Sequence, residues 1–445
     1  MGRSIGKLVI FDEIYKNQIA LPKRLITSSG KGIDVNILRF RQVKYLIVSW
    51  FASILVIGSA FAQDIHVGLY PWVPRVEQFQ TELTKVWKQR YPDDNLIFVA
   101  KEVWDGGYNT DPSDQLDVYV FDAIHMNYLA NNGWLLPLEK SDIDDFEDLF
   151  DYAMDGVKVV DTESYWGIPQ LGCTHMLFYH ASDIELRIAQ TLTQLKTALS
   201  SCQYTGQIPP KKTGLMIDMS GSIINALYLQ AVYSLYNQIP KNLPFSPAEF
   251  NADAIANLRS IMEMSSYDNS TKKAASYQHG VWFEAGYGRA FVGFTESMTV
   301  ISSTTLDNID FKVMPLSNNT ESNPLFYADI VGVYPKQNRS AEEISKVKEL
   351  ANVMASKDYM VSSSIPVPGA LSGPKSNPQY LMPVRKSIFV ELGNKYPIYN
   401  KMQMLVENSS PVLLTMNEQS KTWISEIKAS LQSAIKTDFS CEVSP

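Results

Sequence analysis

Residues that could do chemistry stand where the predicted strands of this chain end. Asp122 ends the apolar stretch 116–122, and Cys173 lies in a Pro-containing segment that runs into another apolar strand. Glu296 and Asp329 stand at the ends of two later stretches of the same kind. Ligands of sheet-based α/β folds bind near the carboxyl ends of strands, so we expect these side chains to meet in one cleft. Each acid taken alone could equally cap a helix or face solvent from a loop.

A thiol among carboxylates is a poor nucleophile unless a base removes its proton. Negative charge nearby raises the pKa of a thiol and lowers its reactivity. Cys173 would therefore need a general base during attack, and Glu296 is the candidate. Spacing alone does not establish this pair, because a free cysteine is often simply a small buried apolar side chain.

Aromatic side chains gather at the same predicted strand ends. Tyr70 and Trp72 follow the first strand, Tyr108 lies in the loop before the third, and Tyr327 precedes Asp329. An aromatic, acidic cleft suits a flat cationic heterocycle, because rings stack on it and carboxylates accept hydrogen bonds from its amino groups. The alternative for each ring alone is core packing, since aromatic residues make up 11% of the chain.

Strand-like and helix-like patterns alternate around these residues. Residues 75–90 carry apolar side chains at helical spacing, and longer helical patterns fill much of 183–290. The strand-like stretches are 65–70, 96–100, 116–122, 289–295, 311–315 and 325–334. This order predicts βαβ units and an α/β protein with mixed, mostly parallel sheets flanked by helices.

No linker separates the halves of the chain, which favours lobes built from interleaved segments. Two α/β lobes joined by strand crossovers describe the periplasmic solute-binding architecture, with the ligand in the cleft between the lobes. We expect one lobe to contain 63–172 and 316–360, and the other to contain 173–315 and 361–445.

Charge and histidine placement narrow the classes of ligand. A net charge of −8 argues against nucleic acid and is compatible with a cationic ligand, although it could also serve solubility alone. His175 and His180 are five apart and would face opposite sides of a strand, so we expect no metal site. The residues suggest no cofactor.

The N-terminal region has the features of an export signal. Residues 45–62 carry no charge, follow three basic residues, and end in a small-x-small pattern. We expect cleavage after Ala62, an exported protein that begins at Gln63, and a true start near Leu38. The alternative is an uncleaved membrane anchor preceded by a cytoplasmic tail, because the apolar run is long enough to span a bilayer.

The three cysteines leave at least one thiol without an intramolecular partner. Export favours oxidation, so Cys202 and Cys441 could form a disulfide and leave Cys173 free. Three free thiols remain the alternative.

Several segments resemble the bacterial thiaminase I, or thiamine pyridinylase, family. The similarity runs from LYPWVP at 69–74 to YPIY at 396–399. Its most specific segments are WGIPQLGCTHMLFY at 166–179 and GRAFVGFTESM at 288–298. The resemblance implies a fold similar to type II periplasmic binding proteins. It also implies cleavage of thiamine at its methylene bridge, with transfer of the pyrimidine to an amine or thiol by a monomer without a cofactor.

The resemblance also implies roles for individual residues. Cys173 would add to the pyrimidine ring, and Glu296 would take the thiol proton. Asp122 and Asp329 match acids that contact the pyrimidine. Other matching positions line the cleft, namely Tyr70, Tyr108, Tyr277 and Tyr327.

Two positions depart from the family pattern. Trp72 and Phe294 stand where tyrosine is common, so the ring is kept and a hydroxyl is lost. The competing interpretation is a solute-binding protein of an uptake system, which would require neither Cys173 nor Glu296 at these places.

Overall fold

The computed structural model describes residues 63–200, 203–240, 242–371 and 373–437, which belong to one compact unit. The predicted start and cleavage sites and the Cys202–Cys441 pair lie outside these residues and stay predictions. None of the described helices is long and apolar enough to cross a membrane.

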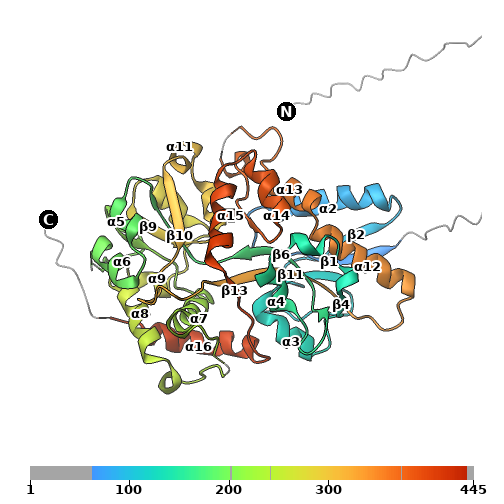
Figure 1. The fold of residues 1–445 in the computed structure, drawn as a ribbon, viewed down its shortest axis with the longest axis horizontal. Coiled ribbons are helices and arrows are strands. Elements are labelled where there is room, and N and C mark those ends of the chain that lie inside the picture. Colours follow the sequence, from blue (N-terminus) through green and yellow to red (C-terminus); the bar gives the residue numbers. More distant parts are fainter. Residues whose placement is uncertain (1–62, 201–202, 241, 372, 438–445) are drawn as a thin grey trace, which may run out of the picture. The chain divides into compact units, whose positions relative to one another are not determined.

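The larger sheet has seven strands, and several of the predicted site residues lie on it (Figure 1). Its main path runs β12-β6-β11-β3-β1-β2, and β13 pairs with β11. The strands are β1 (Asp64–Gly68), β2 (Asn95–Phe98), β3 (Val118–Asp122), β6 (Ile168–Cys173), β11 (Leu325–Val333), β12 (Met382–Pro383) and β13 (Val412–Leu413). β1 is parallel to both neighbours, whereas β11 is antiparallel to β3 and β6.

The second sheet has four strands in the order β10-β7-β9-β8. They are β7 (Met176–His180), β8 (Lys211–Met216), β9 (Gly288–Gly293) and β10 (Ile309–Val313). β8 and β9 are parallel, and the other two pairs are antiparallel. A two-stranded ribbon joins β4 (Leu138–Glu139) and β5 (Ser164–Tyr165).

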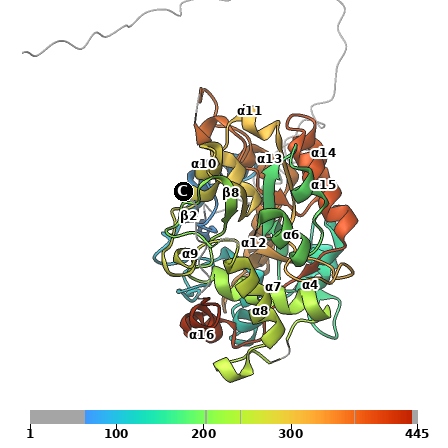
Figure 2. The ribbon, with the colours of Figure 1, turned by 90° about the vertical axis from the view of Figure 1, so that its left-hand side faces the viewer.

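Helices cover both sheets. In Figure 1, α2, α13 and α14 lie above the larger sheet and α3 and α4 below it, while Figure 2 faces the side of α6, α7 and α8. The helices associated with the larger sheet are α2 (Val76–Arg90), α3 (Met126–Asn131), α4 (Asp151–Val157), α12 (Ala341–Met354), α13 (Lys357–Ser364), α14 (Lys386–Gly393) and α15 (Ile398–Ser409). The others are α5 (Ile184–Ile188), α6 (Leu192–Leu199), α7 (Ile223–Tyr236), α8 (Ala252–Met262), α9 (Asp268–Thr271), α10 (Gln278–Glu284), α11 (Ser303–Leu306) and α16 (Ser420–Ala434).

Hydrophobic spacing explains the helices that the sequence predicts best. α2 buries Phe79, Leu83 and Trp87, which are spaced four apart and form one stripe. Burial of each such side chain stabilises the fold by about 1.5–3 kcal/mol. α7 is instead buried around most of its circumference, from Ile224 to Tyr233, because other helices cover it as well.

The two-lobed α/β fold with mixed sheets is confirmed, but parallel pairing does not predominate. The hydrophobic periodicity of a sequence does not show the direction in which a strand runs. In the larger sheet, β11 lies between β3 and β6 and runs antiparallel to both. The division of the chain into two lobes stays a prediction. Within the C-terminal part, β12 pairs with β6 and α14 packs on α13 and α15, whereas α16 packs on α7.

Candidate active site

Strand register brings four of the predicted site residues into one row. Tyr327 of β11 pairs with Cys173 of β6, and Asp329 of β11 pairs with Asp122 of β3. Tyr327 and Asp329 are two residues apart, so their side chains project from the same face of the strand. The three neighbouring strands β6, β11 and β3 therefore place a thiol, a phenol and two carboxyls side by side.

Asp122 is buried and receives two hydrogen bonds. The Tyr108 hydroxyl donates to its Oδ2 at 2.7 Å, and the Ile124 backbone N–H donates to its Oδ1 at 3.1 Å. Burial raises the pKa of Asp122 to about 6, although both hydrogen bonds oppose this shift.

The pKa of Asp329 is raised by burial and then by the negative charges of Asp122 and Glu296. Two neighbouring carboxyls resist simultaneous ionisation. The pair therefore favours one ionised acid, which accepts hydrogen bonds, and one protonated acid, which can donate one.

Cys173 and Glu296, the nucleophile and base that the sequence predicts, lie close enough for their charges to interact. Burial raises the pKa of the Cys173 thiol, and the charges of Glu296, Asp329 and Asp122 raise it further. Glu296 follows β9 in a 3-10 turn, Thr295–Val300, and burial raises its pKa to about 7. Near neutral pH the thiol is protonated while a large share of Glu296 is ionised. Both side chains keep partial exposure, so a small molecule can reach them.

Tyr277 connects this pair to the larger sheet. Its hydroxyl donates to the Trp72 carbonyl oxygen at 3.2 Å, and its pKa is raised by burial and then by the charges of Glu296 and Cys173. Its φ of 60° lies in the left-handed region, which costs of order 1 kcal/mol for a non-glycine residue and is often found at functional sites.

The remaining predicted residues lie around the same group. Tyr70 is enclosed near Tyr108, Asp329, Asp122 and Cys173, whose charges raise its pKa after burial itself. The indole N–H of Trp72 donates to a backbone carbonyl at 2.9 Å, and the side chain is 48% exposed.

Phe294 packs on the imidazole of His175, with ring centroids 4.8 Å apart. The sequence comparison suggested a missing hydroxyl at this position. Glu296 accordingly has no hydrogen-bond donor from residue 294 among the described side chains; its side-chain partner is Thr295, at 3.5 Å.

Two tyrosines near Cys173 and Glu296 escaped the sequence reasoning. Burial is the largest cause that raises the pKa of Tyr152 in α4 and of Tyr399 in α15; the charge of Cys173 adds to the shift at Tyr152, and the charge of Glu296 adds to that at Tyr399. Both hydroxyls are buried without a hydrogen-bond partner. Both rings sit on helices distant from the motifs; only the YPIY match at 396–399 points toward Tyr399.

A cavity of about 890 Å³ lies beside His175, the ring on which Phe294 packs, and outside the group of predicted site residues itself. Its lining includes His175 and Gln230 together with residues of β10 and α15, and none of the predicted site residues. Within the described ranges, no group of three or more His, Cys, Asp or Glu side chains is arranged to hold a metal ion.

The fold and the site define an enzyme of the periplasmic-binding-protein-like class, because a thiol paired with a base is added to the architecture of a binding protein. The family model described as Thiaminase-1 domain matches residues 174–317. Thiaminase-1 of Paenibacillus thiaminolyticus is 31% identical over 382 residues, which cover 83% of this chain and 88% of that protein. The chain belongs to the thiaminase I family.

Solved structures agree with this membership. Clostridium botulinum thiaminase I in complex with thiamin is 31% identical, with a TM-score of 0.78 over 84% of this chain and 100% of that one. Thiaminase I from Bacillus thiaminolyticus gives a TM-score of 0.76 at 30% identity with the same coverage. Maltose-bound MalE3 of T. maritima, at 14% identity and a TM-score of 0.57 over 84% of this chain and 100% of that one, shares the fold.

Proposed function

We propose that this protein is a thiamine pyridinylase, a transferase that cleaves thiamine and passes its pyrimidine to an amine or thiol. The observation that carries the proposal is the convergence of Cys173 and Glu296 with the Asp122–Asp329 pair. The relatives named above point to the same substrate.

The proposed reaction begins at the thiol. Glu296 accepts the Cys173 proton as sulfur forms a bond to the pyrimidine ring, beside the carbon that bears the methylene bridge. The bond between the methylene carbon and the thiazolium nitrogen then breaks, and its electron pair leaves with the neutral thiazole. Glu296 releases this proton to solvent, and an amine or thiol then attacks the methylene carbon and loses its own proton to Glu296. As the carbon–sulfur bond breaks, the departing sulfur takes that proton from Glu296, which restores the neutral Cys173 thiol and the ionised Glu296 and releases the product.

The carboxyl pair suits an aminopyrimidine. An ionised carboxylate accepts a hydrogen bond from the exocyclic amino group, and a protonated carboxyl donates to a ring nitrogen. Asp122 and Asp329 offer both states side by side, since burial and mutual repulsion keep one of them protonated. The surrounding rings of Tyr70, Tyr108 and Tyr327 suit stacking and cation–π contact with the thiamine rings.

A solute-binding protein without catalysis is the alternative for this fold. The acids and aromatic rings would serve binding equally well, but binding gives no use for a thiol next to a base. Fold similarity to the maltose-binding type cannot decide between the two, because fold does not fix function.

The deciding experiment is incubation of the purified protein with thiamine and an excess of aniline. We expect mass spectrometry to show free thiazole and the pyrimidine–aniline adduct. Cys173→Ser should form neither product while it still binds thiamine. Wild-type protein that binds thiamine without consuming it would leave only the binding function.

We further propose that the protein is exported with cleavage after Ala62 and that it acts as a monomer. N-terminal sequencing of protein from the native host tests the first statement, and sedimentation velocity tests the second. Gln63 as the first residue and a single species near the mass of the mature chain are the expected results.

A further inference from the structure

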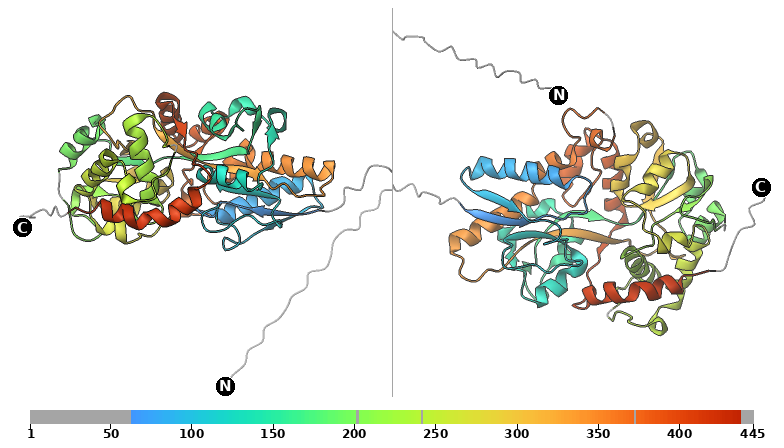
Figure 3. Two further views of the ribbon diagram at one scale, coloured as in Figure 1. Left: turned by 90° about the horizontal axis from the view of Figure 1, so that it is seen from below. Right: turned by 180° about the vertical axis from the view of Figure 1, so that it is seen from behind.

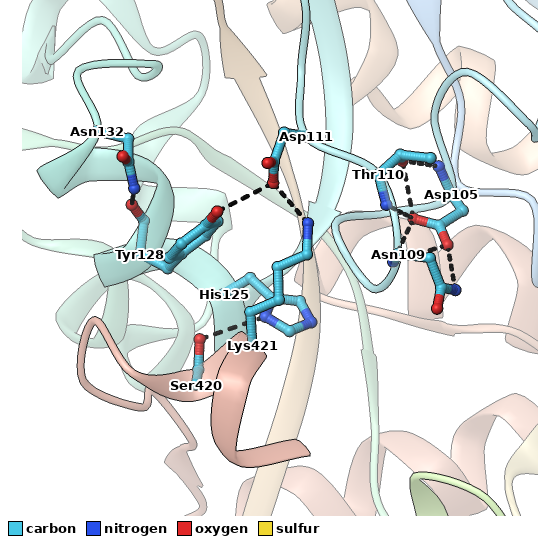
Figure 4. Close-up of polar contacts among 9 residues, drawn as sticks. All are labelled: Asp105, Asn109, Thr110, Asp111, His125, Tyr128, Asn132, Ser420 and Lys421. Carbon is cyan, nitrogen blue, oxygen red and sulfur yellow. Dashed lines mark hydrogen bonds and ion pairs between the residues drawn. The ribbon is translucent and has the colours of Figure 1, made fainter. Parts of the chain in front are cut away.

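The loop that carries Tyr108 is held rigidly from within. Asp105 accepts hydrogen bonds from the backbone N–H groups and side chains of Asn109 and Thr110 (Figure 4). Gly106 and Gly107 have φ values of 90° and 100°, which are strained for any residue with a side chain, and Gly106 also has no space for one. A Cβ atom at Gly106 would lie 2.6 Å from the ring of Tyr70. The backbone path is therefore fixed up to the residue that contacts Asp122.

The same loop is fastened from outside by the first turn of α16. The Lys421 ammonium lies 2.5 Å from Asp111 Oδ1, and the Tyr128 hydroxyl donates to that oxygen at 3.1 Å. Ser420 Oγ lies 3.3 Å from Nδ1 of His125, a buried imidazole. Figure 4 shows these side chains converging between the loop and the helix.

His125 links Ser420 of α16 to Tyr108. Its ring meets that of Tyr108 edge to face, with centroids 5.1 Å apart, and it lies 3.2 Å from the position that a Cβ at Gly107 would occupy. Burial, then the charge of Lys421, lower the pKa of His125 to about 3, so it is a neutral ring at working pH. The neutral His125 ring thus lies between Ser420 and Tyr108 and contacts both.

α16 is also anchored beside the second sheet, both near its beginning and at its end. The Trp423 indole N–H donates to the Pro244 carbonyl at 2.8 Å, and Arg259 of α8 donates to the Ala434 carbonyl at 2.7 Å. Figures 1 and 3 show α16 running between the helices of the second sheet and α3. One helix thereby joins the second sheet's side to the Tyr108 loop on the larger sheet.

We propose that the first turn of α16 is a positioning device, in which Lys421 and Ser420 act through Asp111 and His125 to hold the Tyr108 hydroxyl on Asp122. The proposal rests on the proposed function, in which Asp122 meets the pyrimidine of thiamine. Lys421 is a positioning residue, because it touches neither Asp122 nor the predicted substrate position.

Loss of the contact between Lys421 and Asp111 should raise the pKa of Asp122. The groups that face Asp122 are Tyr108, Tyr70, Cys173, Tyr327 and Asp329, together with one backbone N–H. None is a cation, so the Tyr108 donor is a main support of the ionised form. Complete loss of a hydrogen bond to a charged group raises the pKa of the carboxyl by about one to two units, and partial weakening raises it by less.

The test compares Lys421→Met with Lys428→Met, an exposed residue on the same helix, in full pH profiles of kcat and KM for thiamine. We expect Lys421→Met to raise KM several-fold and to move the acidic limb of kcat/KM upward by up to about one pH unit. Lys428→Met should behave as wild type. Glu296 titrates in every variant, so only the difference between variants is diagnostic.

A double variant separates positioning from general destabilisation. If Lys421 acts through Tyr108, adding Lys421→Met to Tyr108→Phe should change KM and the acidic limb little further. Two results would overturn the positioning role alone. One is full additivity of the two substitutions in KM and in the acidic limb. The other is a Lys421→Met pH profile equal to that of Lys428→Met, even if Lys421→Met lowers the melting temperature. A silent Tyr108→Phe would overturn both this role and the proposed contact of Asp122 with substrate.

Discussion

Replacement of Glu296 by glutamine tests the base that the mechanism requires. Glutamine keeps the size of the side chain but cannot accept the Cys173 proton near neutral pH. Attack must then come from the small fraction of thiolate already present. A thiol with an ordinary pKa of about 8.5 is about 3% ionised at pH 7. Burial of Cys173 makes the true fraction smaller.

The expected loss in kcat/KM at pH 7 is therefore at least about 30-fold, which corresponds to about 2 kcal/mol in the barrier. Removal of the Glu296 charge acts in the opposite direction, because that charge also raises the pKa of Cys173. Burial, which is the largest cause, is unaffected by the substitution. Asp122 and Asp329 also keep their places, so the net loss should persist.

The assay is the initial rate of thiamine consumption with saturating aniline between pH 5 and 10. In the wild type, kcat/KM should fall as pH drops below about 7, where Glu296 becomes protonated. In Glu296→Gln the rate should instead rise about tenfold per pH unit until the thiol is ionised. Glu342→Gln, at an exposed acid on α12, is the matched control. A variant within fivefold of wild type at pH 7, or one with a flat profile, would refute the role of Glu296.

Other predictions follow from the same site. Cys173→Ser should abolish cleavage but bind thiamine, and wild-type protein treated with a pyrimidine that carries a leaving group should gain mass at Cys173; full activity in the variant would contradict the mechanism. Phe294→Tyr should raise the rate or alter the choice of acceptor, whereas unchanged kinetics would mean that the lost hydroxyl is silent. Titration of unfolded, unreduced protein should find one thiol if Cys202 and Cys441 are bridged and three if they are not.

The sequence alone determined the local elements and the candidate chemistry. Apolar spacing in residues 75–90 predicts α2, because a stripe of buried side chains must recur with the helical period. The positions of Cys173, Glu296 and Asp122 at strand ends, together with the family segments, predict the catalytic and substrate-binding groups. These features are encoded within short stretches of chain.

The tertiary structure decided which groups meet and in what state. The antiparallel entry of β11 sets Tyr327 beside Cys173 and Asp329 beside Asp122, and periodicity carries no information about strand direction or register. Burial raises the pKa of Glu296 to about 7, and burial depends on what the whole chain packs around the side chain. Lys421 and Asp111 are 310 residues apart in the sequence, so only the folded chain brings this ion pair to the loop that carries Tyr108.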